Sequence, residues 1–135
     1  MLQPKLLKYR KSFTNAPKNK KAVVDRIIFG NFALLSLENA LIPATQLEAA
    51  RKAIVGYVKR KGKIWMRVFP DRPITKHPAE TRMGSGKGAV DGYQAVVRKG
   101  RILFELGGLD SKDAMEAFRR AGNKLSVKNK VISKQ

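Results

Sequence analysis

The spacing of apolar residues along the chain predicts two helices. The first spans Pro43–Arg60, with the proline in its first turn and Gly62 as its stop. The second begins at Asp110 or Ser111, either of which can cap a helix, and runs to about Ala121. Apolar residues recur at helical spacing in both, as Leu47, Ala50, Ile54, Val55 and Val58 in the first and as Ala114, Phe118 and Ala121 in the second. We expect one face of each helix to lie in the core.

Two β-rich stretches flank the first helix. Residues 25–37 are rich in β-branched and aromatic residues and predict strand structure with a turn or bulge at Gly30-Asn31. Residues 63–69 alternate as a strand does, with Ile64, Met66 and Val68 on one side. Trp65 lies on the other side, and we expect it in the core rather than as a base-stacking platform, because tryptophan is usually well buried.

Further strands are expected in the C-terminal half. Residues 93–106 carry two apolar runs around Lys99-Gly100, which predicts a β-hairpin with a two-residue turn. A last strand is expected around residues 127–132. The order of elements predicts a small α+β domain with two helices and a mixed or mainly antiparallel sheet.

Residues 70–92 interrupt this pattern. The stretch has little apolar periodicity and is rich in proline and glycine (Pro70, Pro73, Pro78, Gly84, Gly86, Gly88 and Gly92). It predicts a long loop, and long loops in small domains are usually functional or disordered. The chain is therefore divided into a basic N-terminal arm, residues 1–22, and a single domain, residues 23–135, that carries the loop 70–92.

The net charge of the chain is the feature that says most about its partner. There are 29 Lys and Arg against 10 Asp and Glu, a net charge of +19. So large a charge repels itself in the compact state and favours a polyanionic partner. No apolar stretch approaches the roughly 18 to 20 residues of a spanning helix, so we expect no membrane partner. RNA is favoured over DNA because no helix-turn-helix, basic zipper or zinc finger is evident.

Two segments of the chain are rich in cations and are candidates for RNA binding. The arm has no acidic residue before Asp25, and its Tyr9 and Phe13 could pack on bases, although a frayed tail is the other reading. The run Arg82–Gly88 resembles a nucleotide-binding loop but has Thr81 where the first glycine belongs and lacks a hydroxyl after Lys87. We therefore expect it to approach RNA phosphates, with a flexible loop as the alternative.

The sequence contains few residues of the types that usually carry out catalysis. There is no cysteine and a single histidine, His77. Asp71, Glu80 and Asp91 could be imagined as the metal site of a small nuclease, but they stand beside cations and form no recognisable motif. We expect neither an enzyme nor a cofactor nor a bound metal.

Several ordered motifs resemble one family, the bacterial-type large-subunit ribosomal protein L16 (uL16). The resemblance covers nearly the whole chain. It rests on Met1–Lys5 with Lys8–Lys11, on Gln46–Arg51, on Lys63–Asp71 and on Pro78–Gly88, the most specific run. It implies a hammerhead-like α+β fold and a structural role in the large ribosomal subunit, where the protein binds rRNA near the central protuberance, joins late in assembly and helps to position A-site tRNA.

The resemblance also implies partners and contact residues. The partners are 23S-type rRNA, 5S-type rRNA where present, A-site tRNA and neighbouring large-subunit proteins. Charge and resemblance together give as rRNA contacts Lys5, Lys8, Tyr9, Arg10, Lys11, Arg51, Lys59, Arg60, Arg67, Lys76 and His77. The loop implied near tRNA and the peptidyl-transferase region comprises Arg82, Met83, Gly84, Ser85, Gly86, Lys87 and Gly88. Some bacterial members carry a hydroxylated arginine at the position of Arg82.

The sequence also departs from the family pattern. Residues 14–25 lack its usual glycine and arginine content, Ala40-Leu41 stands where tryptophan is common, and Ser126 replaces a frequent proline. These departures suggest a divergent lineage, either bacterial or organellar, so the expected location is the ribosome of a bacterium, mitochondrion or plastid. If the lineage is organellar, the start at Met1 suggests synthesis inside the organelle. A free RNA chaperone or assembly factor is the alternative function.

Overall fold

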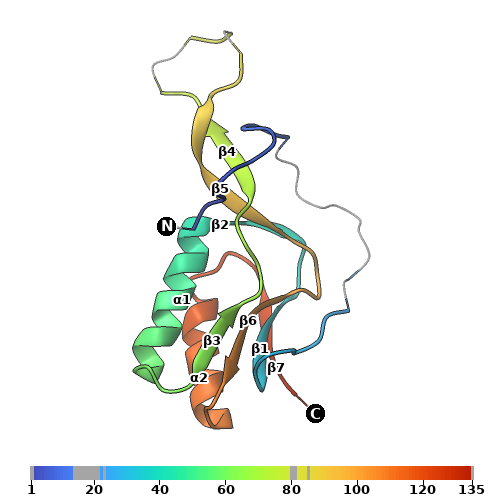
Figure 1. Cartoon of the computed structure of the whole chain (residues 1–135), viewed down its shortest axis with the longest axis vertical. Coiled ribbons are helices and arrows are strands. Elements are labelled where there is room, and N and C mark those ends of the chain that lie inside the picture. The colour runs from blue at the N-terminus through green and yellow to red at the C-terminus, as the bar shows by residue number, and fades with distance from the viewer. Residues whose placement is uncertain (1, 14–21, 23, 80–81, 85, 135) are drawn as a thin grey trace.

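The chain folds into two antiparallel sheets and two helices (Figure 1). The computed structural model describes residues 2–13, 22, 24–79, 82–84 and 86–134. The strands are β1 (Phe32–Ser36), β2 (Ala40–Pro43), β3 (Lys63–Met66), β4 (Arg72–Lys76), β5 (Ala89–Val97), β6 (Ile102–Gly107) and β7 (Asn129–Ser133), and the helices are α1 (Ala44–Val58) and α2 (Ser111–Gly122). This architecture confirms the predicted α+β class. None of the helices in the described part of the chain is long and apolar enough to cross a membrane.

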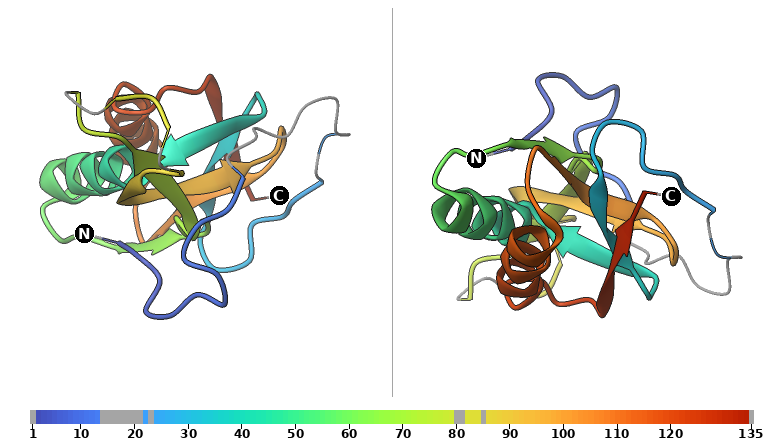
Figure 2. Two further views of the ribbon diagram at one scale, coloured as in Figure 1. Left: turned by 90° about the horizontal axis from the view of Figure 1, so that it is seen from above. Right: turned by 90° about the horizontal axis from the view of Figure 1, so that it is seen from below.

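The core lies between the helices and a four-stranded sheet. That sheet has the order β3-β6-β1-β7, and all six residues of β6 are buried. α1 and α2 lie side by side (Figure 2); α2 packs against β1 and β7 of this sheet, and α1 packs against β2 and β5 of the second sheet. Leu47 and Phe118 from the helices meet Leu34, Phe104 and Leu106 from the sheet, and all five are at most 1% exposed. The predicted apolar faces of both helices are thus confirmed, except that Val55 and Val58 are only partly buried, and Val58 packs against the core from its edge.

The second sheet is a projecting hairpin with a short third strand. Its order is β2-β5-β4, and β5 pairs with β4 from Arg72 opposite Gln94 to Lys76 opposite Ala89. The hairpin leaves the body of the molecule along its long axis and ends in the connection 77–88 (Figure 1). The loop predicted over 70–92 is therefore shorter than expected, because β4 and the first part of β5 form within it.

The predicted hairpin over 93–106 is wrong. β5 and β6 belong to different sheets and do not pair, although Arg101 N–H donates to the carbonyl of Arg98 in a turn. Beyond the turn the chain meets β1 instead, since the amides of Gly100 and Ser36 bond to the carbonyls of Ser36 and Arg101 respectively. The turn between the two runs is real, but it carries the chain from one sheet to the other.

Two element boundaries also differ from the prediction. Residues 25–31 form no strand, and β1 begins only at Phe32. The reason is that the amides of residues 28–30 donate to the buried carboxylate of Glu105 instead of to a neighbouring strand. α1 ends at Val58, before the expected stop at Gly62, because Lys59 and Arg60 adopt left-handed backbone with φ of 51° and 66°. The second helix and the last strand lie close to their predicted ranges.

Candidate RNA interface

The end of the β4–β5 hairpin presents the predicted tRNA-proximal loop to solvent. Arg82, Lys87 and Met83 are exposed, and Met83 projects fully. Gly84 and Gly86 take positive φ values of 106° and 84°, which favour glycine. Gly88 is buried where the hairpin closes, and a Cβ there would lie 2.7 Å from the backbone of Lys76. Ser85, also predicted here, lies outside the described residues.

The N-terminal arm lies against this hairpin. Lys11 Nζ donates to the carbonyl oxygen of Lys87 at 3.1 Å, and Lys87 Nζ donates to that of Ser12 at 2.6 Å. Arg72, on β4, donates to the carbonyl oxygen of Phe13 at 3.0 Å. In Figure 1 the blue arm runs beside β4 and β5. The two cationic segments identified in the sequence therefore meet at one end of the molecule, although about 70 residues separate them along the chain.

Exposed aromatic rings accompany the cations of the arm. Lys8 Nζ lies 5.6 Å from the centroid of Tyr9, and Lys87 Nζ lies 5.7 Å from that of Phe13. The two rings are 70% and 83% exposed. Rings and cations interleaved in this way suit an RNA backbone with unstacked bases beside it. Lys5 and Arg10, the other predicted arm contacts, are exposed as well.

The remaining predicted cations fall into two groups. Lys76 and His77 are exposed at the end of β4, next to the arm and the loop. Lys59 and Arg60 are exposed at the end of α1, and Arg51 pairs with Glu48 on the surface of the same helix. The structure therefore brings the arm, the loop and the end of β4 together, while the helix cations form a separate basic edge.

Arg67 lies in a buried ion-pair network. Its side chain is only 11% exposed and contacts the carboxylates of Asp25 at 3.0 Å and of Glu105. The carboxylate of Glu105 is fully buried and accepts from the amides of Ile28 at 3.1 Å, Phe29 at 2.6 Å and Gly30 at 2.9 Å. We call Asp25, Arg67 and Glu105 the anchor network, because they hold residues 25–30 on the sheet. Arg67 is thus accounted for structurally, and we do not propose it as an RNA contact.

The anchor network keeps its carboxylates ionised. Burial by itself raises the pKa of Glu105, but three backbone N–H donors and Arg67 outweigh it, and the pKa lies below its usual range. Burial likewise opposes ionisation of Asp25, whose pKa is nevertheless lowered by the amides of Ile102 and Arg26 and by Arg67. One signal in the sequence could have revealed the network: Glu105 stands within the apolar run Ile102–Leu106, and a buried carboxylate needs a cation.

The described acidic residues near the hairpin do not form a metal site. Asp71 and Asp91 are both exposed, and Glu80 lies outside the described residues. Within the described ranges, no group of three or more histidine or acidic side chains could hold a metal ion. The nuclease hypothesis therefore gains no support from the geometry.

Comparisons with known proteins identify the family. Residues 4–132 match the family described as "Ribosomal protein L16p/L10e". The chain is 51% identical over 135 residues to "Large ribosomal subunit protein uL16c" of Gracilaria tenuistipitata, which covers all of both chains. It is 50% identical over 132 residues to "Large ribosomal subunit protein uL16" of Thermus thermophilus, which covers 98% of this chain and 94% of the relative. The resemblance seen in the sequence is confirmed, and the chain belongs to the ribosomal protein L16p/L10e family.

Proposed function

We propose that the protein is a structural constituent of the large ribosomal subunit, in a bacterium or an organelle. It binds rRNA near the central protuberance and the A site, helps to position A-site tRNA and supports late assembly of the subunit. Relatives named as large-subunit proteins in Thermus thermophilus and Gracilaria tenuistipitata support the assignment and this range of locations. The partners are 23S-type rRNA, 5S-type rRNA where present, A-site tRNA and neighbouring large-subunit proteins.

The observation that carries the proposal is the joint basic end of the molecule. The arm and the β4–β5 hairpin are tied together by Lys11, Lys87 and Arg72. Among the described residues, the side chains of Lys5, Lys8, Arg10, Lys76 and Arg82 are exposed around these contacts. Phosphate contacts by such cations release counterions and dominate the affinity of basic proteins for RNA. A chain with +19 net charge gains most from that neutralisation when it is embedded in packed RNA.

The β4–β5 hairpin extends the basic end away from the body of the molecule. Its paired strands hold the exposed loop at a distance from the core, so the loop can enter a narrow space between RNA elements (Figure 1). Arg82 is an exposed cation of the loop, and the described contacts between the arm and the loop are made by Lys11 and Lys87 instead. In the proposed mechanism the arm and helix edge fix the protein on rRNA, and Arg82 steadies the tRNA. No catalytic residue takes part.

The first test is the amount of the protein in ribosomal particles. Particles are separated on a high-salt sucrose gradient and the protein is quantified by mass spectrometry. We expect close to one copy per mature large subunit, retained at high salt. Presence only in precursor particles, or loss at moderate salt, would overturn the proposal and favour a free RNA chaperone or assembly factor.

The second test concerns the basic end itself. Substituting Arg82 and Lys87 by Ala should leave the fold intact, because both side chains are exposed outside the strands. Binding of tRNA to the A site of ribosomes that carry the double variant should weaken, and the slope of log affinity against log salt should become shallower by roughly one to two. A matched control removes two exposed cations in and just after α2, Lys112 and Lys124, which belong neither to the basic end nor to the edge of α1. Equal effects of the two double variants would show that only net charge matters, which contradicts the proposed site.

A further inference from the structure

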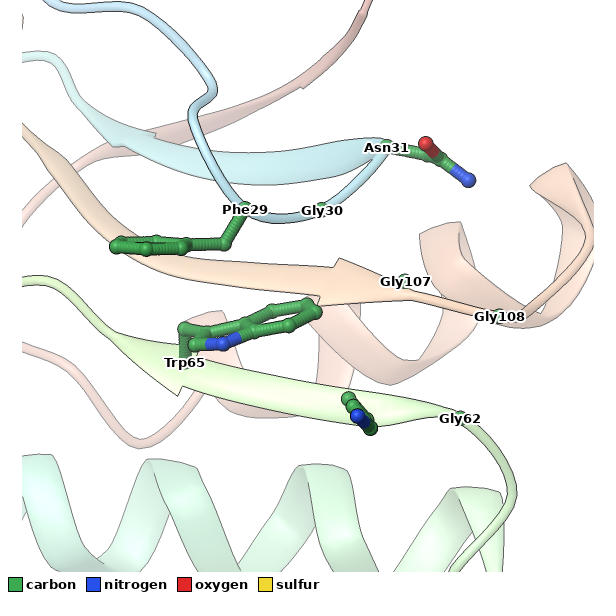
Figure 3. A pocket seen from close by; sticks show the side chains of 8 residues that line it. Phe29, Gly30, Asn31, Gly62, Trp65, Gly107 and Gly108 are labelled. Carbon is green, nitrogen blue, oxygen red and sulfur yellow. The ribbon is translucent and has the colours of Figure 1, made fainter.

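A hollow lined by aromatic rings and glycines lies at the other end of the molecule. It has a volume of about 540 Å³ and is formed by Phe29, Trp65 and the glycines 30, 62, 107 and 108, with Asn31 and Lys63 at its edge (Figure 3). We propose that this aromatic hollow binds an unpaired nucleotide base of RNA, which stacks on the ring of Phe29 or Trp65. The inference rests on the proposed RNA-binding function and adds a second contact far from the arm and the loop.

The two rings form a ready platform. The centroids of Phe29 and Trp65 are 5.8 Å apart and their planes differ by 18°, so the rings stack on each other. Phe29 remains 56% exposed, and Trp65 is only partly buried and outside the core. The expectation that Trp65 belongs to the core is therefore wrong, because its side of β3 faces residues 25–30 and not the helices. Every nucleobase has a flat face that stacks on such rings.

The backbone beneath the platform is held in place. Glu105 of the anchor network accepts hydrogen bonds from the amides of Phe29 and Gly30, which flank the Cα of Phe29. An exposed ring on a fixed backbone loses little further freedom on binding, which favours affinity. A ring that served only to fill space would instead be covered by its neighbours.

The glycines account for the shape of the hollow. A Cβ on Gly30 would lie 2.4 Å from the carbonyl oxygen of Leu106, and one on Gly62 would lie 2.3 Å from that of Gly107. A Cβ on Gly107 would come within 3.2 Å of the indole of Trp65. Close approach of the three chain segments explains these glycines, and the lack of side chains leaves room beside the rings. Packing does not explain why the rings stay uncovered.

The surroundings favour RNA as the occupant. Among the described residues that line the hollow none is acidic, and Lys63 supplies a positive charge beside the rings. The amide of Asn31 offers both a donor and an acceptor for base edges. The residues that line the hollow come from the segments where β1 and β3 begin, at the lower end of Figure 1, whereas β4 ends and β5 begins at the upper end. A base bound there would fix the orientation of the molecule between two RNA elements.

The single tryptophan of the chain makes the inference testable by fluorescence. The full-length protein is titrated with an RNA hairpin that has one unpaired adenosine in its stem, and with the same hairpin fully paired. We expect the unpaired base to change Trp65 emission and to tighten binding on the order of tenfold, since stacking on an aromatic side chain is worth about 1–3 kcal/mol per base. The fully paired hairpin should bind through charge alone.

Substitutions separate stacking from simple apolar contact. Phe29→Leu keeps apolar volume but lacks a ring, so it should remove the preference for the unpaired adenosine, whereas Phe29→Tyr should retain it. Met115→Ala, at a side chain 55% exposed on α2, is the control for loss of exposed apolar surface. Equal binding of both hairpins by the original protein, or an undiminished preference in Phe29→Leu, would overturn the inference alone. A protein that binds neither hairpin would overturn the proposed function as well.

Discussion

Replacing Glu105 by glutamine should clearly destabilise the fold, because its carboxylate lies at the centre of the anchor network. The carboxylate is fully buried and takes four donors, which are three backbone amides and the guanidinium of Arg67. Glutamine has nearly the same shape, but it offers one acceptor oxygen and turns an NH₂ group toward donors. At least one amide between Ile28 and Gly30 then loses its partner, and Arg67 loses half of its countercharge.

The size of the effect follows from these contacts. Removing one partner of a buried ion pair costs about 3–5 kcal/mol, because the other charge is left uncompensated. Arg67 keeps Asp25 at 3.0 Å, so we expect a loss near the lower end, about 3 kcal/mol. For a chain of 135 residues this lowers Tm by about 10 °C.

Thermal unfolding followed by circular dichroism measures this loss, and hydrogen exchange locates it. The amides of Ile28, Phe29 and Gly30 should lose protection, while those of α2 should keep theirs below the unfolding transition. Glu116→Gln is the control, because that carboxylate pairs with Arg119 and Arg120 on the surface of α2 and should matter little. If Glu105→Gln unfolds at the same temperature as Glu116→Gln, the anchor network does not stabilise the fold as argued.

Three further outcomes are expected. First, the folded-state pKa values of Asp25 and Glu105 are lowered, so the stability that they contribute should be complete above about pH 4 and be lost as the pH falls through those values. Denaturant unfolding from pH 7 to 3 should therefore show a smaller loss of unfolding free energy at low pH in Glu105→Gln than in the original protein. Second, Gly88→Ala should cost about 1–3 kcal/mol in denaturant unfolding, since its Cβ would meet backbone at 2.7 Å, whereas Gly92→Ala, with nothing within 4 Å, should be tolerated. Third, Asp110→Ala should cost about 1 kcal/mol in the same measurement, because the side chain accepts from the third amide of α2, and Asp110→Asn should restore most of it.

Elements specified by neighbouring residues could be predicted from the sequence. The second helix was placed from Asp110 and its apolar spacing, and the side chain does cap the helix. Charge and glycine content alone also single out the cations of the arm and the loop, whose described members are exposed, while their RNA contacts stay a prediction. In each case the deciding contacts lie within a few residues of one another.

Features specified by distant partners could not be predicted. The turn chemistry of Lys99-Gly100 is compatible with a hairpin, but the apolar residues of β6 are better covered between β1 and β3, on both faces of a central strand. Arg67 meets acids that are 42 residues before it and 38 after it, a separation that leaves no pattern in the sequence. The contact of Lys87 with the arm spans 75 residues and is hidden for the same reason.

The position of β1 constrains when the protein can fold during its own synthesis. β1 (Phe32–Ser36) pairs with β6 and β7, whose last residues are Gly107 and Ser133. The four-stranded sheet thus joins β1 to strands that lie far behind it along the chain, and loop closure over such distances is slow. A nascent chain therefore exposes its apolar strands, and its basic arm, until β7 has been synthesised and can pair with β1. We expect newly made protein to need protection from premature contacts with RNA or with itself.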